Sequence, residues 1–485
     1  MDFNRPDVYI QDVSNGASPI QQASSTVGIL IGAMKSGPVG EPILVSSWTE
    51  FIQNFANGLD TPFMKESDLP YSVYGFFANG GNSVYVVRVA SSTAKKATGT
   101  GTKNTNLTFT AKNPGNFKPT VQIKKSADWV ENTNDVYDVI ITMSSSDDGV
   151  ATISEVTKDT IVKAINTDMT AKEWIVAEAT SVLATLSEET ITLTDGADGI
   201  TDLKDADYIN ALEVCSTIDD ASFLAIPGQT STAVNDAILT YCDAHMLFPI
   251  LDMPVGSTVK QTKEYRKSIS AYGGILAYPW GNVTDPLTDG TKLVPTAGHV
   301  MGVYSRIIGA QGIKKAPAGV DAVVKGFLSM EKKLTDAEIG QLNPVGVVCI
   351  VPRTNAGIVI WGARGLNPKA DMRYVTDVII NYNIKKSLYS GTQFAVFEPN
   401  DESLWSRVKA TCEDFLENLR LNGVLKGSKE EAYFVTCDAT NNTDATINNG
   451  FLYVEIGYAP VKPAEFVVIK LTHSMSSGSV TLPQG

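Results

Sequence analysis

Asp252 is the residue of this chain best placed by position to do chemistry. It ends an apolar segment, residues 246–252, that has the length and composition of a strand. Open parallel sheets bind ligands beyond the carboxyl ends of their strands, so a carboxylate there could act as an acid or base. A lone carboxylate also has simpler roles, which are capping the next helix or pairing with a lysine. We therefore assign Asp252 no catalytic role.

The motifs that enzymes use for phosphates, metals and nucleophiles do not occur in this sequence. Neither G-x-G-x-x-G after a strand nor G-x-x-x-x-G-K-[ST] is present, and G-x-S-x-G is absent. The three histidines, His245, His299 and His473, have no second ligand residue at metal-binding spacing. Residues 195–199 suggest a calcium loop but lack its third ligand and its closing glutamate. The sequence thus predicts no catalytic residue, no cofactor and no metal site.

Arg364 lies inside a predicted tight turn. The apolar run of residues 358–361 indicates a buried strand, which breaks at Gly362 and Gly365 on either side of the arginine. As a functional residue, Arg364 would bind an anion or a carboxylate of a neighbouring subunit. As a structural residue, it would pair with a local Asp or Glu and pin the turn, which is the simpler interpretation.

Length and charge restrict the class of protein. At 485 residues we expect two to four domains, and 43% hydrophobic residues is typical of a globular chain. The formal net charge of -14 disfavours binding to nucleic acid or to an anionic membrane. No apolar run approaches the roughly 20 residues that cross a bilayer, and no secretory pattern begins the chain, so we expect synthesis in a cytosol. We expect the five cysteines to be buried, reduced thiols.

Short apolar segments alternate with helical patterns along most of the chain. This alternation predicts an α/β fold whose mostly parallel sheet is covered on both faces, built from residues 21–90 and 200–375. Its strands are expected at residues 27–32, 83–90, 223–227, 246–252, 274–278, 344–351 and 357–361.

Residues 91–199 interrupt this alternation. Residues 91–103 are small, polar and glycine-bearing, which is typical of a flexible connector. In residues 104–199 threonine is frequent and the apolar segments are short. We expect an inserted β-rich domain, because exposed loops accept insertions most easily.

Residues 376–463 are expected to form a C-terminal α+β domain. Strands at residues 375–380, 394–397, 433–437 and 451–458 would flank a helix at 401–421. That helix has one apolar face, and Asn400 can cap its start. The chain ends, residues 1–20 and 464–485, are expected to be extended arms with strand-like runs, which are Val8, Tyr9 and Ile10, and then Phe466, Val468, Ile469 and Leu471.

Several of these segments, in this order, resemble the contractile-tail sheath proteins of phages and related injection systems. The similar segments are the WGAR turn at 361–364, the RYV of 373–375, the FEPN of 397–400 and Trp405 in a helix, preceded by 27–32, 80–88 and 223–228. The resemblance covers residues 20–90 and 205–472 and leaves out the inserted domain.

The resemblance implies a structural subunit that is not an enzyme. Members of this family stack as six-fold rings into a helical sleeve around a tail tube, and the sleeve contracts without nucleotide hydrolysis to drive the tube through a cell envelope. The implied partners are further copies of the chain, the tube protein, and baseplate and tail terminator proteins. No nucleic acid and no membrane insertion are implied. The implied location is the tail of a virion or phage-like particle assembled in the bacterial cytoplasm.

The resemblance also implies roles for particular residues. The strand-like runs of both arms would pair with sheets of adjacent subunits. Trp361 and Arg364 would lie at the junction of the core and the C-terminal domain. The helix at 401–421 would face the tube, although a solvated face is the simpler interpretation of its charged residues Arg407, Lys409, Glu413, Glu417 and Arg420.

Two other functions stay open from the residues alone. One is an α/β enzyme with an unrecognised active site. The other is a baseplate or tube protein, although the length and the predicted parallel sheet argue against a tube protein, which is typically a small β-barrel.

Overall fold

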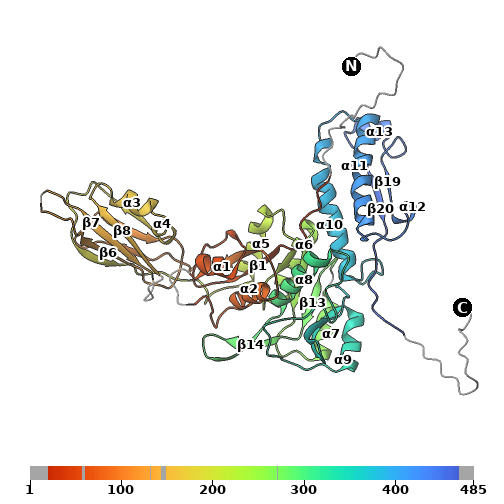
Figure 1. Cartoon of the computed structure of the whole chain (residues 1–485), viewed down its shortest axis with the longest axis horizontal. Helices are drawn as coiled ribbons and strands as arrows, with labels where there is room; N and C mark the ends of the chain where they lie inside the picture. The colour runs from red at the N-terminus through yellow and green to blue at the C-terminus, as the bar shows by residue number, and fades with distance from the viewer. Residues whose placement is uncertain (1–19, 57–60, 132, 144–148, 270, 469–485) are drawn as a thin grey trace, which may run out of the picture.

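The structure is a computed structural model that describes residues 20–56, 61–131, 133–143, 149–269 and 271–468. Its parts lie in a row (Figure 1): a β-rich domain at one end, a large α/β body in the middle and a helical C-terminal region at the other end. No helix within the described ranges is long and apolar enough to cross a membrane.

An eight-stranded sheet organises the middle body. Its order is β18-β17-β13-β12-β11-β1-β3-β2. The six inner strands run parallel, and an antiparallel strand closes each edge, so the sheet is mixed. The bounds are β1 Gly28–Ala33, β2 Pro42–Val45, β3 Val84–Val89, β11 Phe223–Ala225, β12 Phe248–Asp252, β13 Ile275–Tyr278, β17 Val347–Arg353 and β18 Gly357–Trp361.

Both faces of this sheet are buried, which explains why its strands are continuous apolar runs. In β1, Leu30 packs into one apolar cluster while Ile29 and Ile31 pack into a second cluster on the opposite face. The first face is covered by α1 Trp48–Phe55, α2 Leu69–Ala78 and α8 Ala297–Gln311. The second is covered by α5 Asp205–Val214, α6 Thr232–His245, α7 Val259–Ser268 and α9 Asp336–Leu342.

The inserted segment forms two antiparallel sheets around its own core. One sheet orders β4-β5-β9 and the other β10-β6-β7-β8. Their bounds are β4 Thr98–Thr100, β5 Leu107–Ala111, β6 Thr120–Lys125, β7 Tyr137–Thr142, β8 Val150–Val156, β9 Ile175–Ala179 and β10 Glu189–Thr192, with helices α3 Ile161–Thr167 and α4 Ala171–Trp174. A separate small sheet of the middle body comprises β14 Gly281–Asp285, β15 Gly290–Val294 and β16 Ser329–Met330.

The prediction of a flexible connector at residues 91–103 is wrong. This stretch contains β4, and Ala97 is fully buried. The fully buried Arg88 also ties the insert to the body, since its guanidinium donates to the carbonyl oxygens of Gly37 (2.6 Å) and Pro114 (2.7 Å). Small polar residues here pair in a sheet because the neighbouring strand β5 supplies the hydrogen-bond partners.

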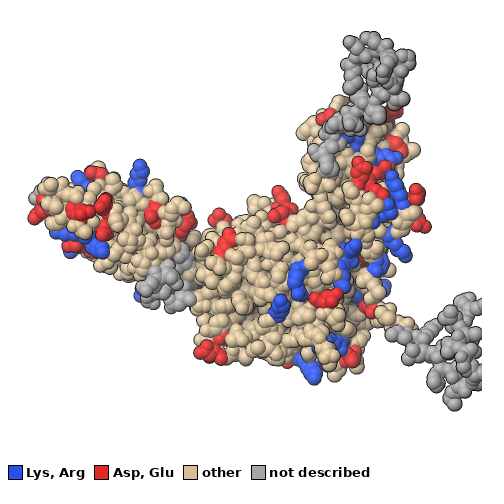
Figure 2. Space-filling model, in the orientation of Figure 1, with Lys and Arg blue, Asp and Glu red and all other residues tan. Residues whose placement is uncertain are grey.

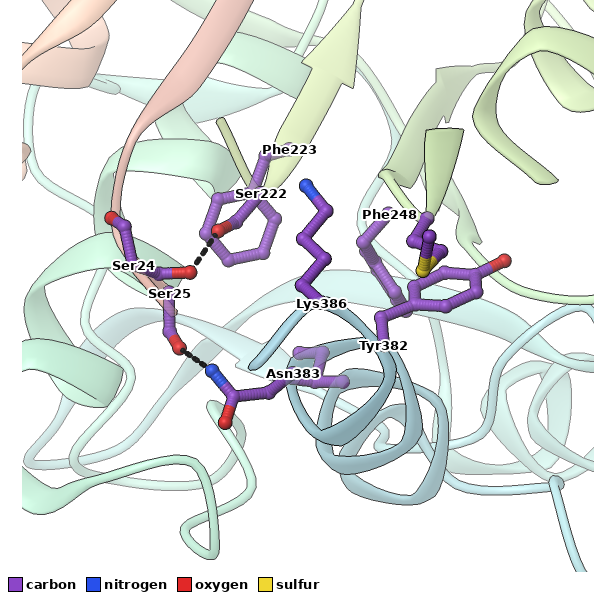
Figure 3. Close-up of a pocket in the computed structure, with 10 residues that line it drawn as sticks. Ser24, Ser25, Ser222, Phe223, Phe248, Tyr382, Asn383 and Lys386 are labelled. Atoms are coloured by element: carbon purple, nitrogen blue, oxygen red, sulfur yellow. Dashed lines mark hydrogen bonds between the residues drawn. The ribbon is translucent and has the colours of Figure 1, made fainter. Parts of the chain in front are cut away.

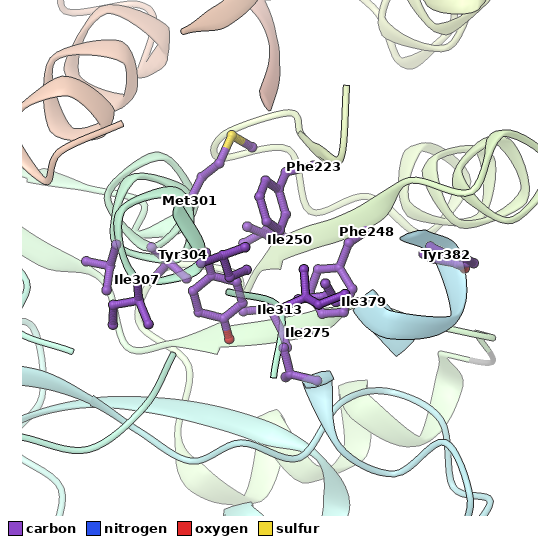
Figure 4. Close-up of a cluster of buried hydrophobic side chains, with 14 of the residues drawn as sticks. Phe223, Phe248, Ile250, Ile275, Met301, Tyr304, Ile307, Ile313, Ile379 and Tyr382 are labelled. Carbon is purple, nitrogen blue, oxygen red and sulfur yellow. The ribbon is translucent and has the colours of Figure 1, made fainter. Parts of the chain in front are cut away.

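The predicted strand at residues 375–380 is wrong, because these residues begin the long helix α10, Val375–Gly391. The helix is buried around most of its circumference, so its sequence lacks the amphipathic period that reveals a surface helix. Its side chains Ile379 and Tyr382 belong to the apolar cluster on the first face of the sheet, which also contains Phe248 (Figure 4). The Asp377 carboxylate accepts from the Tyr374 N–H (3.2 Å) and marks the start of the helix.

Other C-terminal elements agree in part with the sequence. Helix α11, Glu402–Leu421, is confirmed, but its cap is Asp401, which accepts from the Leu404 N–H at 2.9 Å. Asn400 instead accepts from the Trp405 indole at 2.7 Å. The strand expected at 394–397 is a short 3-10 helix, Gln393–Ala395, and the last strand is only β20, Glu455–Tyr458, paired with β19, Tyr433–Thr436. Two short helices, α12 Lys429–Ala432 and α13 Asp444–Asn448, complete the region.

Candidate functional site: two anchors on helix α10

Asp252 is a helix cap. Its carboxylate accepts from the backbone N–H groups of Thr296 and Ala297 (both 3.0 Å) at the start of α8. Burial raises the pKa of Asp252 to about 7, although these hydrogen bonds oppose the shift. Asp252 therefore caps a helix, as expected, but the helix is α8 and not the next one along the chain. The reason is that the fold brings the start of α8 to the end of β12.

The described histidines and cysteines do not form a reactive cluster. His299 is buried against the ring of Phe327, and burial lowers the pKa of His299 to about 3. His245 stacks on Tyr241, whereas His473 lies outside the described residues. All five cysteines are buried and unbonded, and no group of metal-ligand side chains gathers within the described ranges.

The chain's C-terminal segment is held by a charged cluster that we call the C-terminal anchor: Arg364, Tyr374, Asn343, Glu465 and the ion pair of Lys462 with Asp377. Glu465 lies at its centre. One oxygen accepts from Arg364 Nε (3.0 Å), Arg364 Nη2 (2.8 Å) and the Tyr374 hydroxyl (3.1 Å), and the other accepts from Asn343 Nδ2 (2.6 Å). Arg364 thus pairs with a carboxylate a hundred residues away in the chain, which pins the departing tail as well as the turn.

The pKa values of the anchor's two carboxylates shift in opposite directions. Burial alone would raise the pKa of Glu465, but hydrogen bonds from Arg364, Asn343 and Tyr374 outweigh it and lower the pKa below the ordinary value. Asp377 lies at the start of α10, fully buried, and pairs with Lys462 Nζ at 2.8 Å. There burial dominates, and the pKa of Asp377 is raised despite that pair. Burial therefore opposes the ionised form of both carboxylates, and only at Glu465 do the hydrogen bonds outweigh it.

The chain's N-terminal segment is held along the second half of α10 by neutral groups. We call this set the N-terminal anchor: Asn383, Ser387, Gln22, Ala23 and Ser25. Asn383 Nδ2 donates to the Ala23 carbonyl (2.9 Å) and to Ser25 Oγ (2.8 Å), and Asn383 Oδ1 accepts from Gln22 Nε2 (3.2 Å). The Ala23 N–H donates to Ser387 Oγ at 2.9 Å. Asn383 and Ser387 share a face because they are four residues apart in a helix.

Close packing and one lysine reinforce this N-terminal anchor (Figure 3). Lys386, also on α10, donates to the Ala221 carbonyl, and burial lowers the pKa of Lys386 to about 8. Ser222 Oγ donates to the Ser24 carbonyl at 2.7 Å. A Cβ atom on Gly391 would lie 2.4 Å from Ile20, so the helix needs glycine where the chain crosses its end. The gap between these groups is only about 20 Å³, which excludes a ligand larger than water.

The charged residues singled out on α11 are not its outermost ones. Arg407, Lys409, Glu413, Glu417 and Arg420 are all partly buried. Arg420 donates to Glu417 at 2.6 Å, and Arg407 lies over the ring of Phe394 at 4.3 Å. On the face that Figure 2 shows, Lys/Arg and Asp/Glu side chains are interspersed over the C-terminal region.

The other predicted site residues lie near the C-terminal anchor or outside the described ranges. Trp361 is partly exposed, with the Arg353 guanidinium 4.3 Å from its ring centre. Phe466 and Val468 are described but form no strand here, and their side chains are 73% and 79% exposed. The remaining predicted arm residues lie outside the described residues, which are Val8, Tyr9, Ile10, Ile469 and Leu471.

Glu465 and the two polar α10 residues of the N-terminal anchor, Asn383 and Ser387, were not predicted from the sequence. For Asn383 and Ser387 a signal existed, since they are polar residues at helical spacing within an apolar stretch. That signal becomes readable only once residues 375–391 are recognised as a helix. No sequence signal marks Glu465, because its partners lie about a hundred residues earlier in the chain.

Family models match most of the chain outside the insert. The phage tail sheath protein central domain matches residues 202–366, and the phage tail sheath C-terminal domain matches residues 368–472. Among curated proteins, the tail sheath protein of Escherichia phage P2 is 22% identical over 51% of this chain and 62% of its own length. That of Vibrio phage KVP40 is 26% identical over 38% of this chain and 27% of its own length. The chain thus spans less than two thirds of these relatives.

Solved structures share the fold over nearly the whole chain. The contracted sheath of an extracellular contractile injection system has a TM-score of 0.61 and 21% identity, covering 98% of this chain and 99% of that one. A sheath tail protein from Listeria innocua has a TM-score of 0.65 and 12% identity, covering 91% and 96%. The two family models together match more than half of the residues, and the resemblance noted in the sequence is confirmed: this chain belongs to the phage tail sheath family.

Proposed function

We propose that this chain is the repeating, non-enzymatic subunit of a contractile tail sheath. Copies would stack as six-fold rings around a tail tube and contract without nucleotide hydrolysis to drive the tube through a cell envelope. The observation that carries this proposal is that the segments leading to both arms are held against one buried helix. The C-terminal segment is held at the start of the helix through Asp377, and the N-terminal segment is held along its second half through Asn383 and Ser387. Helix α10 has 17 residues and is about 25 Å long, so it links the two attachments rigidly.

Such anchors suit a subunit whose contacts must survive a large rotation. A sleeve that changes length needs heterologous contacts and two packings of its subunits separated by a barrier. Arms that pair as strands with neighbouring sheets keep their backbone hydrogen bonds while the connecting segment bends. We assign this role to Val8, Tyr9 and Ile10 in the arm 1–20 and to the run from Phe466 to Leu471 in the arm 464–485.

The sheet β19–β20 is the acceptor that we propose for these arms. Within the described residues, β20 pairs on one side only, with β19. Beside it lies a groove of about 740 Å³ whose apolar walls include Leu404, Val408 and Val454. Phe397, fully exposed with a positive φ of 68°, stands on the rim of this groove. Unpaired strand edges next to apolar grooves accept added strands.

The remaining assignments follow the same proposal. The core would comprise residues 21–90 and 200–375, with 91–199 inserted and 376–463 as the C-terminal domain. Partners would be the tube through α11, and baseplate and terminator proteins at the sheath ends, with no nucleic acid bound and no membrane insertion. The particle would assemble in the bacterial cytoplasm and carry the sheath on its tail.

Negative-stain electron microscopy of the purified chain tests this function. The full chain should form long hollow cylinders, and a chain lacking residues 1–20 should stay folded and soluble but form none. A finer pair of variants is Tyr9→Pro, which removes a strand hydrogen bond, and Tyr9→Val, which keeps strand propensity. Normal cylinders from the deletion or from Tyr9→Pro would refute arm exchange, whereas dispersed particles from the full chain would refute the sheath role.

A further inference from the structure

Three arginines line a single cavity of about 260 Å³ beside the C-terminal anchor. Arg266 comes from α7, Arg364 from the turn after β18, and Arg373 from the segment just before α10. Among the described residues that line this cavity there is no aspartate or glutamate. Three arginines from distant parts of the sequence thus line one cavity, and no described acidic side chain lines it with them.

Most of the donor capacity of these arginines is not satisfied within the described part of the chain. Arg364 uses Nε and Nη2 on Glu465, and its Nη1 donates to no residue in the described ranges. Arg373 makes no side-chain hydrogen bond or ion pair to any described residue. Within the described ranges, Glu465 pairs with one of the three arginines, and the other two have no ion-pair partner.

Arg266 contributes a buried charge. It is only 9% exposed and donates to the carbonyl oxygens of Ile269 (2.8 Å) and Leu366, which are neutral acceptors. No residue in the described ranges accepts a hydrogen bond from its buried Nε. A buried cation that meets only carbonyl groups is costly unless an anion lies nearby, and burial accordingly lowers the pKa of Arg266.

Backbone atoms form the rest of the cavity and keep it small. Gly346 has a positive φ of 81°, and a Cβ there would lie 2.1 Å from the Gly365 carbonyl oxygen. The same Cβ atom would lie 3.7 Å from Arg266 Nε. No side chain can therefore fill this position, and the space suits a compact ligand.

We propose that this cavity binds a small oxyanion, held by Arg373 and the free Nη1 of Arg364 above the buried charge of Arg266. Guanidinium groups bind the oxygens of phosphate or carboxylate through paired, charge-assisted hydrogen bonds. The oxyanion is either free in solution, as inorganic phosphate is, or a carboxylate of a second copy of this chain. The site does not depend on the proposed function, because an unassembled subunit contains every residue of it.

Inorganic phosphate is the probe for the test. Thermal unfolding of the full chain is compared in phosphate and in chloride at equal ionic strength and pH, and phosphate binding is measured separately by 31P line broadening. We expect phosphate to raise the wild-type Tm by about 1–3 °C, since a ligand that binds only the folded state stabilises it. Arg373→Gln should lose both effects. The matched control is Lys369→Gln, which removes an exposed cation that does not line the cavity.

Two results would overturn the site: equal Tm increases in the wild type and both variants, or no 31P broadening by the unassembled wild type. Repeating the 31P experiment on assembled cylinders identifies the source of the oxyanion. Broadening that persists after assembly supports a free ion. Broadening that assembly abolishes, and that returns on disassembly, supports a carboxylate of a second copy in the same pocket.

Discussion

The two anchors of α10 hold the chain's ends by different chemistry. At the start of the helix the departing C-terminal segment is held by charge, through Glu465 on Arg364 and Lys462 on Asp377. Along the second half of the helix the incoming N-terminal segment is held mainly by the neutral groups of Asn383 and Ser387. One helix therefore carries an attachment that depends on ionisation and another in which most contacts do not.

This difference predicts that solution conditions act on the two ends separately. Ion pairs weaken when a partner is neutralised or screened, whereas amide and hydroxyl hydrogen bonds between neutral groups are nearly insensitive to both. Two backbone amides report on the anchors: Val461 N–H, bonded to Val424 O at 3.1 Å, and Ala23 N–H, bonded to Ser387. Hydrogen exchange at these amides gives the free energy of opening of each end.

The largest effect is expected from Arg364→Ala. It leaves Glu465, whose side chain is 13% exposed, without its charged partner, and should lower the free energy of opening at Val461 by about 2–3 kcal/mol. Ala23 should keep its protection. The control is Arg353→Ala, which breaks an ion pair of similar length whose partner Asp336 is 85% exposed, and should leave Val461 unchanged. Equal losses at Val461 and Ala23 would mean that the anchors are not independent.

Asn383→Ala should release the N-terminal segment. It removes hydrogen bonds to Ala23 and Ser25, so the free energy of opening at Ala23 should fall by about 1–2 kcal/mol with Val461 unaffected. Asn418→Ala, on the exposed face of α11, is the matched control and should change neither amide. Full protection of Ala23 in Asn383→Ala would show that the remaining contacts, the Ser387 bond and the packing of Ile20 on Gly391, hold the segment without Asn383.

Acid should loosen the C-terminal anchor first. The folded-state pKa of Glu465 lies below its ordinary value of 4.5, so its stabilising contribution is complete above 4.5 and disappears as the pH falls through the lowered pKa. Val461 should lose protection in that range, and Glu465→Gln should lack this part of the dependence. Because the raised pKa of Asp377 acts in the opposite direction in both chains, the difference between them isolates Glu465. Identical pH profiles would remove Glu465 from the anchor.

Salt should have the smallest effect. The Arg364–Glu465 pair is mostly buried, so raising the ionic strength should reduce the protection of Val461 by less than about 0.5 kcal/mol. Ala23 should not change measurably. A larger loss at Ala23 than at Val461 would reverse the assignment of charge to the C-terminal end.

Prediction from the sequence succeeded where a residue's neighbours along the chain decide its structure. The strand at Gly357–Trp361 and the helix Glu402–Leu421 are periodic or bounded by glycine and a capping residue, and both are observed. It failed at residues 375–380, where a strand was predicted and the helix Val375–Gly391 begins. Burial on nearly all sides removed the period that would have indicated a helix.

The sequence by itself determined the family, the two-sided burial of the main strands and a cation in the turn after β18. Apolar runs, glycines and the order of motifs can be read directly from the sequence, without knowledge of the fold. Only the tertiary structure decided that Arg364 meets Glu465, that Asp252 caps α8 and that Arg266, Arg364 and Arg373 share one cavity. Each of these contacts joins residues that are far apart in the chain, and no local pattern specifies which distant group will satisfy a buried charge.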